Sequence, residues 1–117
     1  MCKQKKVCVI GLGYVGLPTA TIIASKEFKV NGYDFNSEIV DIINRGDIHI
    51  VEPYLKGLVE YVVKNNYLKA YSQPLTSDIY IIAVPTPIDV QKIPDIFYVE
   101  KAIDSIIPIL KEGDLIL

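Results

Sequence analysis

The sequence predicts an α/β fold, a doubly wound parallel sheet covered by helices on both faces. Short apolar runs alternate along the chain with segments in which apolar residues recur at helical spacing. The apolar runs are unbroken and rich in β-branched residues, which is typical of parallel strands buried on both faces. At 117 residues the chain has room for one domain with one core.

The strands are recognised by their β-branched residues and by the residues that end them. The first run leads directly into Gly11, the second ends at Asp34, and Pro85 ends the strongest run. The expected strands cover residues 7–10, 29–34, 68–72, 79–84 and 114–117. We expect them in the order 3-2-1-4-5, with the chain truncated in or just after the fifth strand.

Four helices are expected between these strands. The first follows the glycines of the first turn directly. Ser37 is a suitable N-cap for the second helix, which Gly46 should stop. Pro53 suits the first turn of the third helix. The fourth begins at about Asp95, and Pro108 should kink or end it.

Composition and charge argue against several classes of protein. The sequence has 12 basic and 14 acidic residues, whereas nucleic-acid binders usually gather a basic excess on one face. No apolar run approaches the roughly 18 residues that suggest a membrane span, and the first run is too short for a signal peptide. The single histidine and two cysteines suggest neither a metal site nor a disulfide framework. We therefore expect a cytoplasmic protein without nucleic-acid or membrane partners.

A glycine motif lies where the first strand passes into the first helix. The residues at 11–16 read Gly-Leu-Gly-Tyr-Val-Gly, and this context is the one that a dinucleotide-binding G-x-G-x-x-G requires. Gly11 allows a tight turn, Gly13 lets the backbone approach a pyrophosphate, and Gly16 lets helix and strand pack closely. The free N–H groups at the helix N-terminus would then face the phosphates. The motif predicts a Rossmann-like, dinucleotide-binding domain.

Asp34 ends the second expected strand at about the separation, roughly 20 residues, of a ribose-binding carboxylate. Such a carboxylate accepts hydrogen bonds from both hydroxyls of the adenosine ribose and repels a 2′-phosphate. None of Phe35, Asn36 and Ser37 is basic, so NAD is favoured over NADP. The alternative interpretation of Asp34 is a polar residue that only ends a strand.

The segment Val84-Pro85-Thr86-Pro87 closes the fourth expected strand. Ligands of a doubly wound sheet bind beyond the carboxyl ends of the strands, where the strand order reverses, here between the first and fourth strands. Thr86 is therefore expected beside the glycine motif, where its hydroxyl could bond a cofactor phosphate, a ribose or a water. A rigid turn made by two prolines accounts for the same residues equally well.

Three polar residues outside the motifs are given no catalytic role. His49 lies between two isoleucines and is interpreted as a packed or loop histidine rather than a catalytic base. Glu52, before Pro53, suits the positive end of a helix dipole. Cys8 falls in a buried strand and is interpreted as a small core residue.

Three motifs occur in combination: IGLGYVGLP at residues 10–18, GYD at 32–34 and AVPTP at 83–87. Together they resemble the UDP-glucose/GDP-mannose dehydrogenase family, and the resemblance covers nearly the whole chain. The segment INRGDIHIVEP at residues 43–53, together with Pro94-Asp95 and Tyr98-Val99-Glu100, is similar to the members that oxidise UDP-N-acetyl-D-mannosamine.

The resemblance implies that the complete enzyme oxidises the C6 hydroxyl of a UDP-amino sugar to a carboxylate for surface polysaccharide biosynthesis, with two hydride transfers to NAD through a covalent thioester. It also implies a set of cofactor contacts: Gly11, Gly13, Tyr14, Val15, Gly16, Asp34, Val84, Pro85 and Thr86. The nucleophilic cysteine and its supporting lysine and asparagine belong to later domains of the family. No catalytic residue is therefore expected in this chain, apart from a water-ordering role for Thr86.

The resemblance further implies a domain organisation in which residues 1–117 form the NAD-binding domain. A central helical domain and a C-terminal UDP-sugar-binding domain are expected beyond it, and the complete protein is expected to be a homo-oligomer. Because the nucleophile is not expected in these residues, the chain alone should be inactive.

Other functions stay open from the residues alone. The same family includes enzymes for UDP-glucose, UDP-N-acetylglucosamine and UDP-N-acetylgalactosamine. A non-enzymatic NAD-sensing module would share the glycine motif and Asp34, but it has no reason for the proline-rich turn at residues 84–87. A dehydrogenase of β-hydroxy acids can begin with a similar Gly-Leu-Gly turn.

Overall fold

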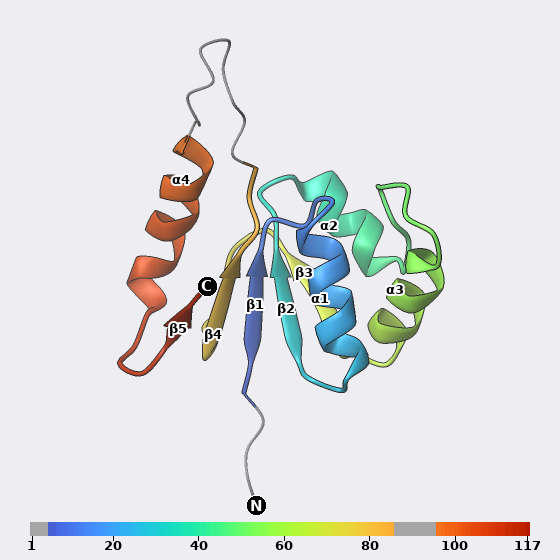
Figure 1. Cartoon of the computed structure of the whole chain (residues 1–117), viewed down its shortest axis with the longest axis horizontal. Coiled ribbons are helices and arrows are strands. Elements are labelled where there is room, and N and C mark those ends of the chain that lie inside the picture. The colour runs from blue at the N-terminus through green and yellow to red at the C-terminus, as the bar shows by residue number, and fades with distance from the viewer. Residues whose placement is uncertain (1–4, 86–95) are drawn as a thin grey trace, which may run out of the picture.

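The computed structural model describes residues 5–85 and 96–117. Within these ranges, parallel strands form one five-stranded sheet in the order β3-β2-β1-β4-β5 (Figure 1). The strands are β1 Val7–Ile10, β2 Val30–Tyr33, β3 Leu68–Tyr71, β4 Ile79–Ile82 and β5 Leu115–Ile116. The predicted Rossmann-like sheet and its strand order are confirmed.

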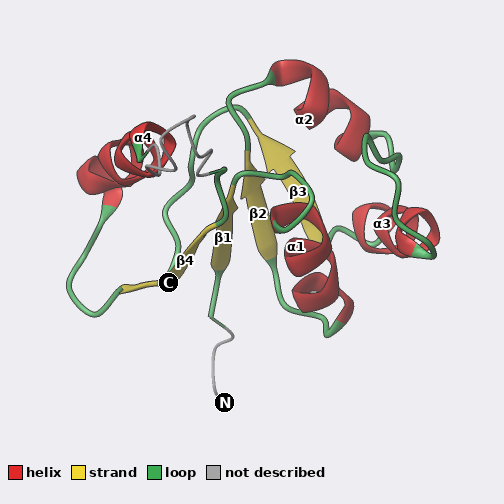
Figure 2. Ribbon diagram, turned by 45° about the horizontal axis from the view of Figure 1, so that its top comes forward, coloured by secondary structure: helices red, strands yellow, loops and turns green. Residues whose placement is uncertain are grey.

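Helices cover both faces of this sheet, as Figure 2 shows, with α4 on one side and α1 and α3 on the other. The helices are α1 Gly16–Ser25, α2 Ser37–Asn44, α3 Leu55–Lys64 and α4 Phe97–Ile106. A 3-10 helix, η1 Ile107–Ile109, follows α4 and contains Pro108, which therefore ends the α-helix as predicted. The predicted start of this helix at Asp95 lies outside the described residues.

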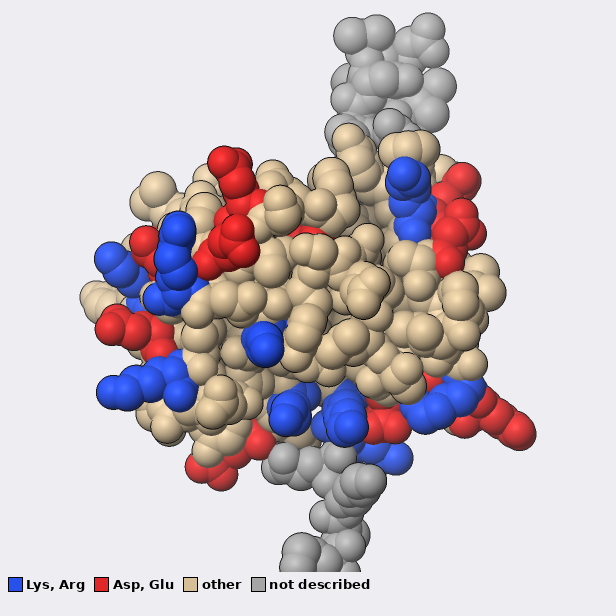
Figure 3. Space-filling view, turned by 180° about the vertical axis from the view of Figure 1, so that it is seen from behind, with Lys and Arg blue, Asp and Glu red and all other residues tan. Residues whose placement is uncertain are grey.

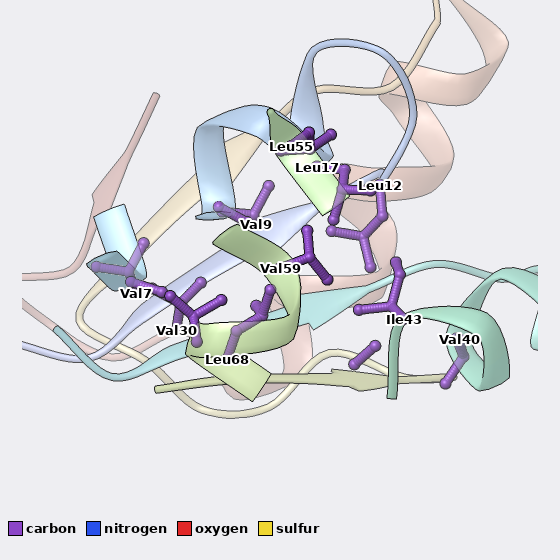
Figure 4. Packing of buried hydrophobic residues seen from close by; sticks show 14 of the residues in the cluster. Val7, Val9, Leu12, Leu17, Val30, Val40, Ile43, Leu55, Val59 and Leu68 are labelled. Atoms are coloured by element: carbon purple, nitrogen blue, oxygen red, sulfur yellow. The ribbon is translucent and has the colours of Figure 1, made fainter. Parts of the chain in front are cut away.

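Alternate residues of β1 enter two cores, one on each face of the sheet, where the sequence predicted a single core; the reason is that successive side chains of a strand point to opposite faces. Val7 and Val9 belong to the larger core, which α1, α2 and α3 cover. Figure 4 shows strand residues of this core packed against helix residues such as Leu17 and Val59. Cys8 and Ile10 belong to the smaller core beneath α4. Cys8 is fully buried, which confirms its interpretation as a core residue.

The ends of α2 differ slightly from the prediction. The N-cap is Asn36 rather than Ser37, since the Asn36 side chain accepts a hydrogen bond from the Glu38 N–H at 3.0 Å. Ser37 is already the first helical residue, so this prediction was wrong by one position. Gly46 follows the helix with a φ of +79°, which confirms it as the stop signal.

The start of α3 also differs from the prediction. Pro53 was expected in its first turn, but the helix begins at Leu55. Tyr54 precedes it with a φ of +68°, in the left-handed region, so the helix cannot extend back through this residue. Pro53 consequently lies in the turn before the helix.

The charged side chains of the described residues show no dominant sign on the face seen in Figure 3, where blue and red atoms are interspersed around the rim. Among the described residues, none of the helices combines the length and the apolar character needed to cross a bilayer. Nor does this part of the chain bring together three or more histidine, cysteine or carboxylate side chains that could hold a metal ion.

Candidate cofactor-binding site

The candidate site lies at the carboxyl edge of the sheet, where the turn after β1 meets the end of β4 (Figure 1). The Ala83 N–H donates to the Ile10 carbonyl at 2.8 Å, which continues the β1–β4 pairing up to the turn. A Cβ added to Gly11 would lie 2.8 Å from the Ala83 oxygen and 3.1 Å from Val84 Cγ1. The predicted meeting of the glycine turn with the end of the fourth strand is therefore confirmed as far as Val84.

The three glycines of the motif occupy different environments. Gly11 has a φ of +93°, a conformation that favours glycine. A Cβ on Gly16 would lie 1.6 Å from the Gly11 carbonyl oxygen, so this glycine permits the contact between helix and turn. A Cβ on Gly13 would meet no protein atom within 4 Å, which leaves the backbone open to an approaching ligand. These environments correspond to the three roles that the motif predicts.

The N-terminus of α1 presents free backbone donors beside these glycines. Among the described residues, no oxygen accepts from the N–H groups of Gly13, Tyr14 or Val15, and the first helical bond of the turn runs from Leu17 N–H to Gly13 O at 3.0 Å. The first turn of α1 contains no acidic residue that would neutralise the positive end of its dipole. Tyr14 and Val15 are exposed. The arrangement fits the phosphate groups of a dinucleotide.

Asp34 follows β2 and connects it to the glycine turn. One carboxylate oxygen accepts from the buried Leu12 N–H at 3.0 Å, and the other accepts from the Asn36 N–H at 2.9 Å. A carboxylate offers about four lone-pair sites, so each oxygen can accept a further hydrogen bond from a ribose hydroxyl. Phe35 is exposed beside it, and no basic side chain occurs in the three positions after Asp34.

Leu12 anchors the turn, although no sequence argument selected it. Its side chain is fully buried in the larger core, as Figure 4 shows. A Cβ on Gly32 would lie 2.9 Å from two of its methyl carbons, so the glycine in β2 makes room for it. An isolated glycine inside a strand is a known signal of such close approach, and Gly32 could have been read that way.

His49 also reaches the glycine turn. Its Nε2 lies 2.6 Å from the Leu12 carbonyl oxygen, and its side chain is half-buried in the loop between α2 and α3. This confirms a packed loop histidine and adds a contact that the sequence did not indicate. Glu52 is exposed in the same loop.

The remaining predicted site residues fall at the end of β4 or outside the described ranges. Val84 is half-buried and Pro85 is exposed. Thr86 and Pro87 lie outside the described residues. Cys8 lies on the α4 side of β1. Its burial raises the pKa of the thiol from 9.0 to about 11. Such a thiol is protonated at neutral pH and unsuited to nucleophilic attack.

Comparison with known proteins gives one consistent result. The model of the UDP-glucose/GDP-mannose dehydrogenase family, NAD binding domain, matches residues 5–117. The UDP-N-acetyl-D-mannosamine dehydrogenase of Campylobacter jejuni is 55% identical over 118 residues, which cover 100% of this chain and 29% of that protein. The NDP-N-acetyl-D-galactosaminuronic acid dehydrogenase of Ralstonia nicotianae is 50% identical, covering 97% of this chain and 27% of that protein.

Solved structures agree with these sequence matches. The UDP-N-acetyl-mannosamine dehydrogenase of Staphylococcus aureus superimposes with a TM-score of 0.91 at 43% identity, covering 95% of this chain and 27% of that chain. The GDP-mannose dehydrogenase of Pseudomonas aeruginosa, solved as a ternary complex, gives a TM-score of 0.81 at 30% identity, covering 86% of this chain and 24% of that one. The chain thus spans less than a third of the length of these relatives.

Proposed function

The chain belongs to the UDP-glucose/GDP-mannose dehydrogenase family and matches the NAD-binding domain of that family. We propose that its glycine turn, Asp34 and the end of β4 hold NAD. The open N–H groups of Gly13, Tyr14 and Val15 bind the pyrophosphate of NAD. Asp34 binds the adenosine ribose, and Val84, Pro85 and Thr86 supply the remaining cofactor contacts.

The observation that carries this assignment is the hydrogen bond between Asp34 and the Leu12 N–H, at 3.0 Å. It ties the carboxylate at the end of β2 to the turn that follows β1. The ribose-binding and phosphate-binding groups are thereby held at a fixed separation before any ligand arrives. Preorganisation of this kind lowers the entropic cost of binding. The carboxylate also disfavours the 2′-phosphate of NADP.

The complete protein is proposed to be a longer enzyme that oxidises the C6 hydroxyl of UDP-N-acetyl-D-mannosamine to the uronic acid for surface polysaccharide biosynthesis. This is supported by 55% identity to the Campylobacter jejuni dehydrogenase, of which the chain covers 29%. The parts that bind the UDP-sugar and supply the catalytic cysteine are placed beyond Leu117. We place this enzyme in the cytoplasm as a homo-oligomer.

In this proposal the described residues bind and orient the cofactor, and NAD supplies the hydride acceptor when it is bound. Tyr14 and Val15 line the phosphate-binding turn. Cys8 takes no part, because it is buried on the α4 side of the sheet. The chain alone is expected to bind NAD weakly at best and to turn over no sugar, because the nucleophile of the reaction is assigned to other parts of the complete protein.

The test is NADH production by the complete protein with UDP-N-acetyl-D-mannosamine, UDP-glucose and UDP-N-acetylglucosamine in parallel. Oxidation of an alcohol to a carboxylate removes two hydrides, so we expect two NADH per sugar, with the mannosamine nucleotide preferred. NADP in place of NAD should give much slower turnover. NAD binding without NADH from any of the three sugars would instead favour the NAD-sensing module.

A further inference from the structure

We infer that His49 is a positioning residue of the cofactor site, which holds the Leu12 carbonyl and thereby aims the Gly13 N–H at the pyrophosphate. The inference rests on the proposed function, since it assigns a role in the same NAD-binding turn. It concerns a loop between α2 and α3 that lies outside the glycine motif.

The contact itself fixes the direction of the hydrogen bond. The His49 Nε2 is 2.6 Å from the Leu12 carbonyl oxygen. A carbonyl oxygen has no proton and can only accept, so the Nε2 of His49 must carry the hydrogen that it donates. The contact is partly buried, which limits competition from water.

The acceptor belongs to the same peptide unit as the Gly13 N–H. The described part of the chain has no cis peptide bond, so the carbonyl of Leu12 and the N–H of Gly13 point in opposite directions. An imidazole that holds the carbonyl therefore also sets the direction of the N–H. Among the described residues no oxygen accepts from that N–H, which leaves it for a ligand.

The peptide on the other side of Leu12 is held by a different element. There the Leu12 N–H donates to Asp34 at 3.0 Å. Both backbone polar groups of Leu12 are thus held from outside the turn, one from the end of β2 and one from the loop after α2. Gly13 has no side chain and nothing within 4 Å of its Cβ position, and its carbonyl accepts from Leu17 N–H at 3.0 Å, so its N–H side is held only through the Leu12 peptide.

The loop that carries His49 is itself firmly placed. After the end of α2 the Gly46 N–H donates to Ile43 O at 2.8 Å and the Asp47 N–H to Ile42 O at 3.1 Å. Ile50 is buried in the larger core on the far side of His49. The histidine is therefore oriented by the fold before the cofactor binds.

Three substitutions separate the hydrogen bond from the packing of the ring. In His49→Gln the amide nitrogen occupies about the position of Nε2 and can donate. In His49→Asn the donor falls short of that position, and His49→Phe keeps a ring without a donor. We expect His49→Phe and His49→Asn to weaken NAD binding about five- to tenfold, the effect of one lost neutral hydrogen bond, and His49→Gln to stay within about twofold of wild type.

Calorimetric titration of the chain with NAD measures these affinities, and urea unfolding of each variant checks that the fold is retained. Wild-type affinity in His49→Phe would overturn the inference. So would equal losses in His49→Gln and His49→Phe, because ring packing would then be responsible.

A second readout does not need the cofactor. In ¹H–¹⁵N spectra of the free chain, the Gly13 amide signal should shift or broaden more in His49→Phe than in His49→Gln. An unchanged Gly13 signal in His49→Phe would overturn the inference. Failure of the wild-type chain to bind NAD, with the Gly13 signal responding as expected, would count against the proposed function and leave the positioning of the turn by His49 established.

Discussion

At the scale of single residues, Gly16 and Gly13 have such different surroundings that an alanine substitution should lower stability at Gly16 and NAD affinity at Gly13. Gly16→Ala would place a Cβ 1.6 Å from a backbone oxygen, and relieving that overlap requires the helix or turn to move. We expect it to lower the free energy of unfolding by about 3 kcal/mol or more.

Gly13→Ala should change stability little, because its Cβ meets nothing within 4 Å in the protein. We expect its stability to stay within about 1 kcal/mol of wild type while NAD affinity falls strongly, since the methyl group occupies the phosphate's approach. Urea unfolding and NAD titration of both variants measure the contrast. Equal stability of the two variants would contradict the assigned environments.

Tyr54 illustrates strain at a single exposed residue. Its φ is +68° and its side chain is 96% exposed, so it has an unfavourable backbone and little burial to compensate for it. Tyr54→Gly should raise the free energy of unfolding by about 1 kcal/mol relative to Tyr54→Ala, which removes the side chain but keeps an L-residue. A glycine variant no more stable than the alanine variant would show that the left-handed conformation costs nothing here.

Cys8 gives the fold a specific dependence on alkaline pH. Burial raises the pKa of its thiol in the folded chain from 9.0 to about 11. Below pH 9 the thiol is protonated in both the folded and the unfolded chain, so it does not change the free energy of unfolding. Between pH 9 and about 11 the thiol is ionised in the unfolded chain but still protonated in the folded one. The free energy of unfolding should therefore fall by about 1.4 kcal/mol per pH unit from this group as the pH rises.

The measurement is urea unfolding of wild type and Cys8→Ala across that range, since all other groups titrate alike in both proteins. The wild-type curve should fall more steeply than the alanine curve. Parallel curves would mean that the folded thiol ionises as it does in water.

At this same scale the environments of the glycines and the position of Asp34 could be predicted, because they depend on a local motif with a known context. Gly32 signals a close approach but does not identify Leu12 as its partner, and the role of His49 could not be predicted. The contact between His49 and Leu12 joins the turn to a loop more than thirty residues away, a distance in sequence that helix and strand periodicity does not encode.

At the scale of elements, the edge strand β3 is closed by a side chain from α2. The Asn44 amide donates to Ala70 O at 2.9 Å and accepts from Ala70 N–H at 2.8 Å. Tyr67 O accepts from Val30 N–H in β2 and Tyr71 O from Asp34 N–H just after it, so Ala70 faces the outer edge. Asn44 therefore satisfies the backbone groups of Ala70 that a strand from another chain could otherwise pair with, which protects this sheet edge against self-association.

Asn44→Ala should lower the free energy of unfolding by about 1–3 kcal/mol, because two hydrogen bonds are lost. It should also promote self-association through β3, which sedimentation can detect. Asn65→Ala is the matched control, since Asn65 makes one exposed side-chain hydrogen bond, to Tyr61 O at 2.8 Å. A loss no greater than that of the control, with no association, would contradict the role of Asn44.

The spacing of apolar residues predicts which helices and strands form, but it predicts less accurately the residues at which the helices begin. Gly46 and Pro108 act as predicted, because a helix stop depends on the conformation of one residue. The starts of α2 and α3 were each misplaced by one or two residues. Asn36 and Ser37 are both good N-caps, and the left-handed conformation of Tyr54 is not a property that a tyrosine in sequence reveals.

At the scale of the whole molecule, the order of the parallel strands brings the carboxyl ends of β1, β2 and β4 to one edge of the sheet. Three distant segments of sequence meet there: the glycine turn, Asp34 and the end of β4. We propose that this edge of the sheet is the NAD site. The order of strands could be predicted because the crossover pattern leaves few arrangements for a parallel sheet, and the dinucleotide-binding glycine motif favours the Rossmann order among them.

The most direct test is to titrate the ¹⁵N-labelled chain with NAD and follow every backbone amide. We predict that the largest shifts fall on Gly13, Tyr14 and Val15, with Asp34 and Asn36 next, and that NADP at the same concentration causes much smaller shifts. Shifts centred away from the carboxyl edge of the sheet, or none at saturating NAD, would contradict the account.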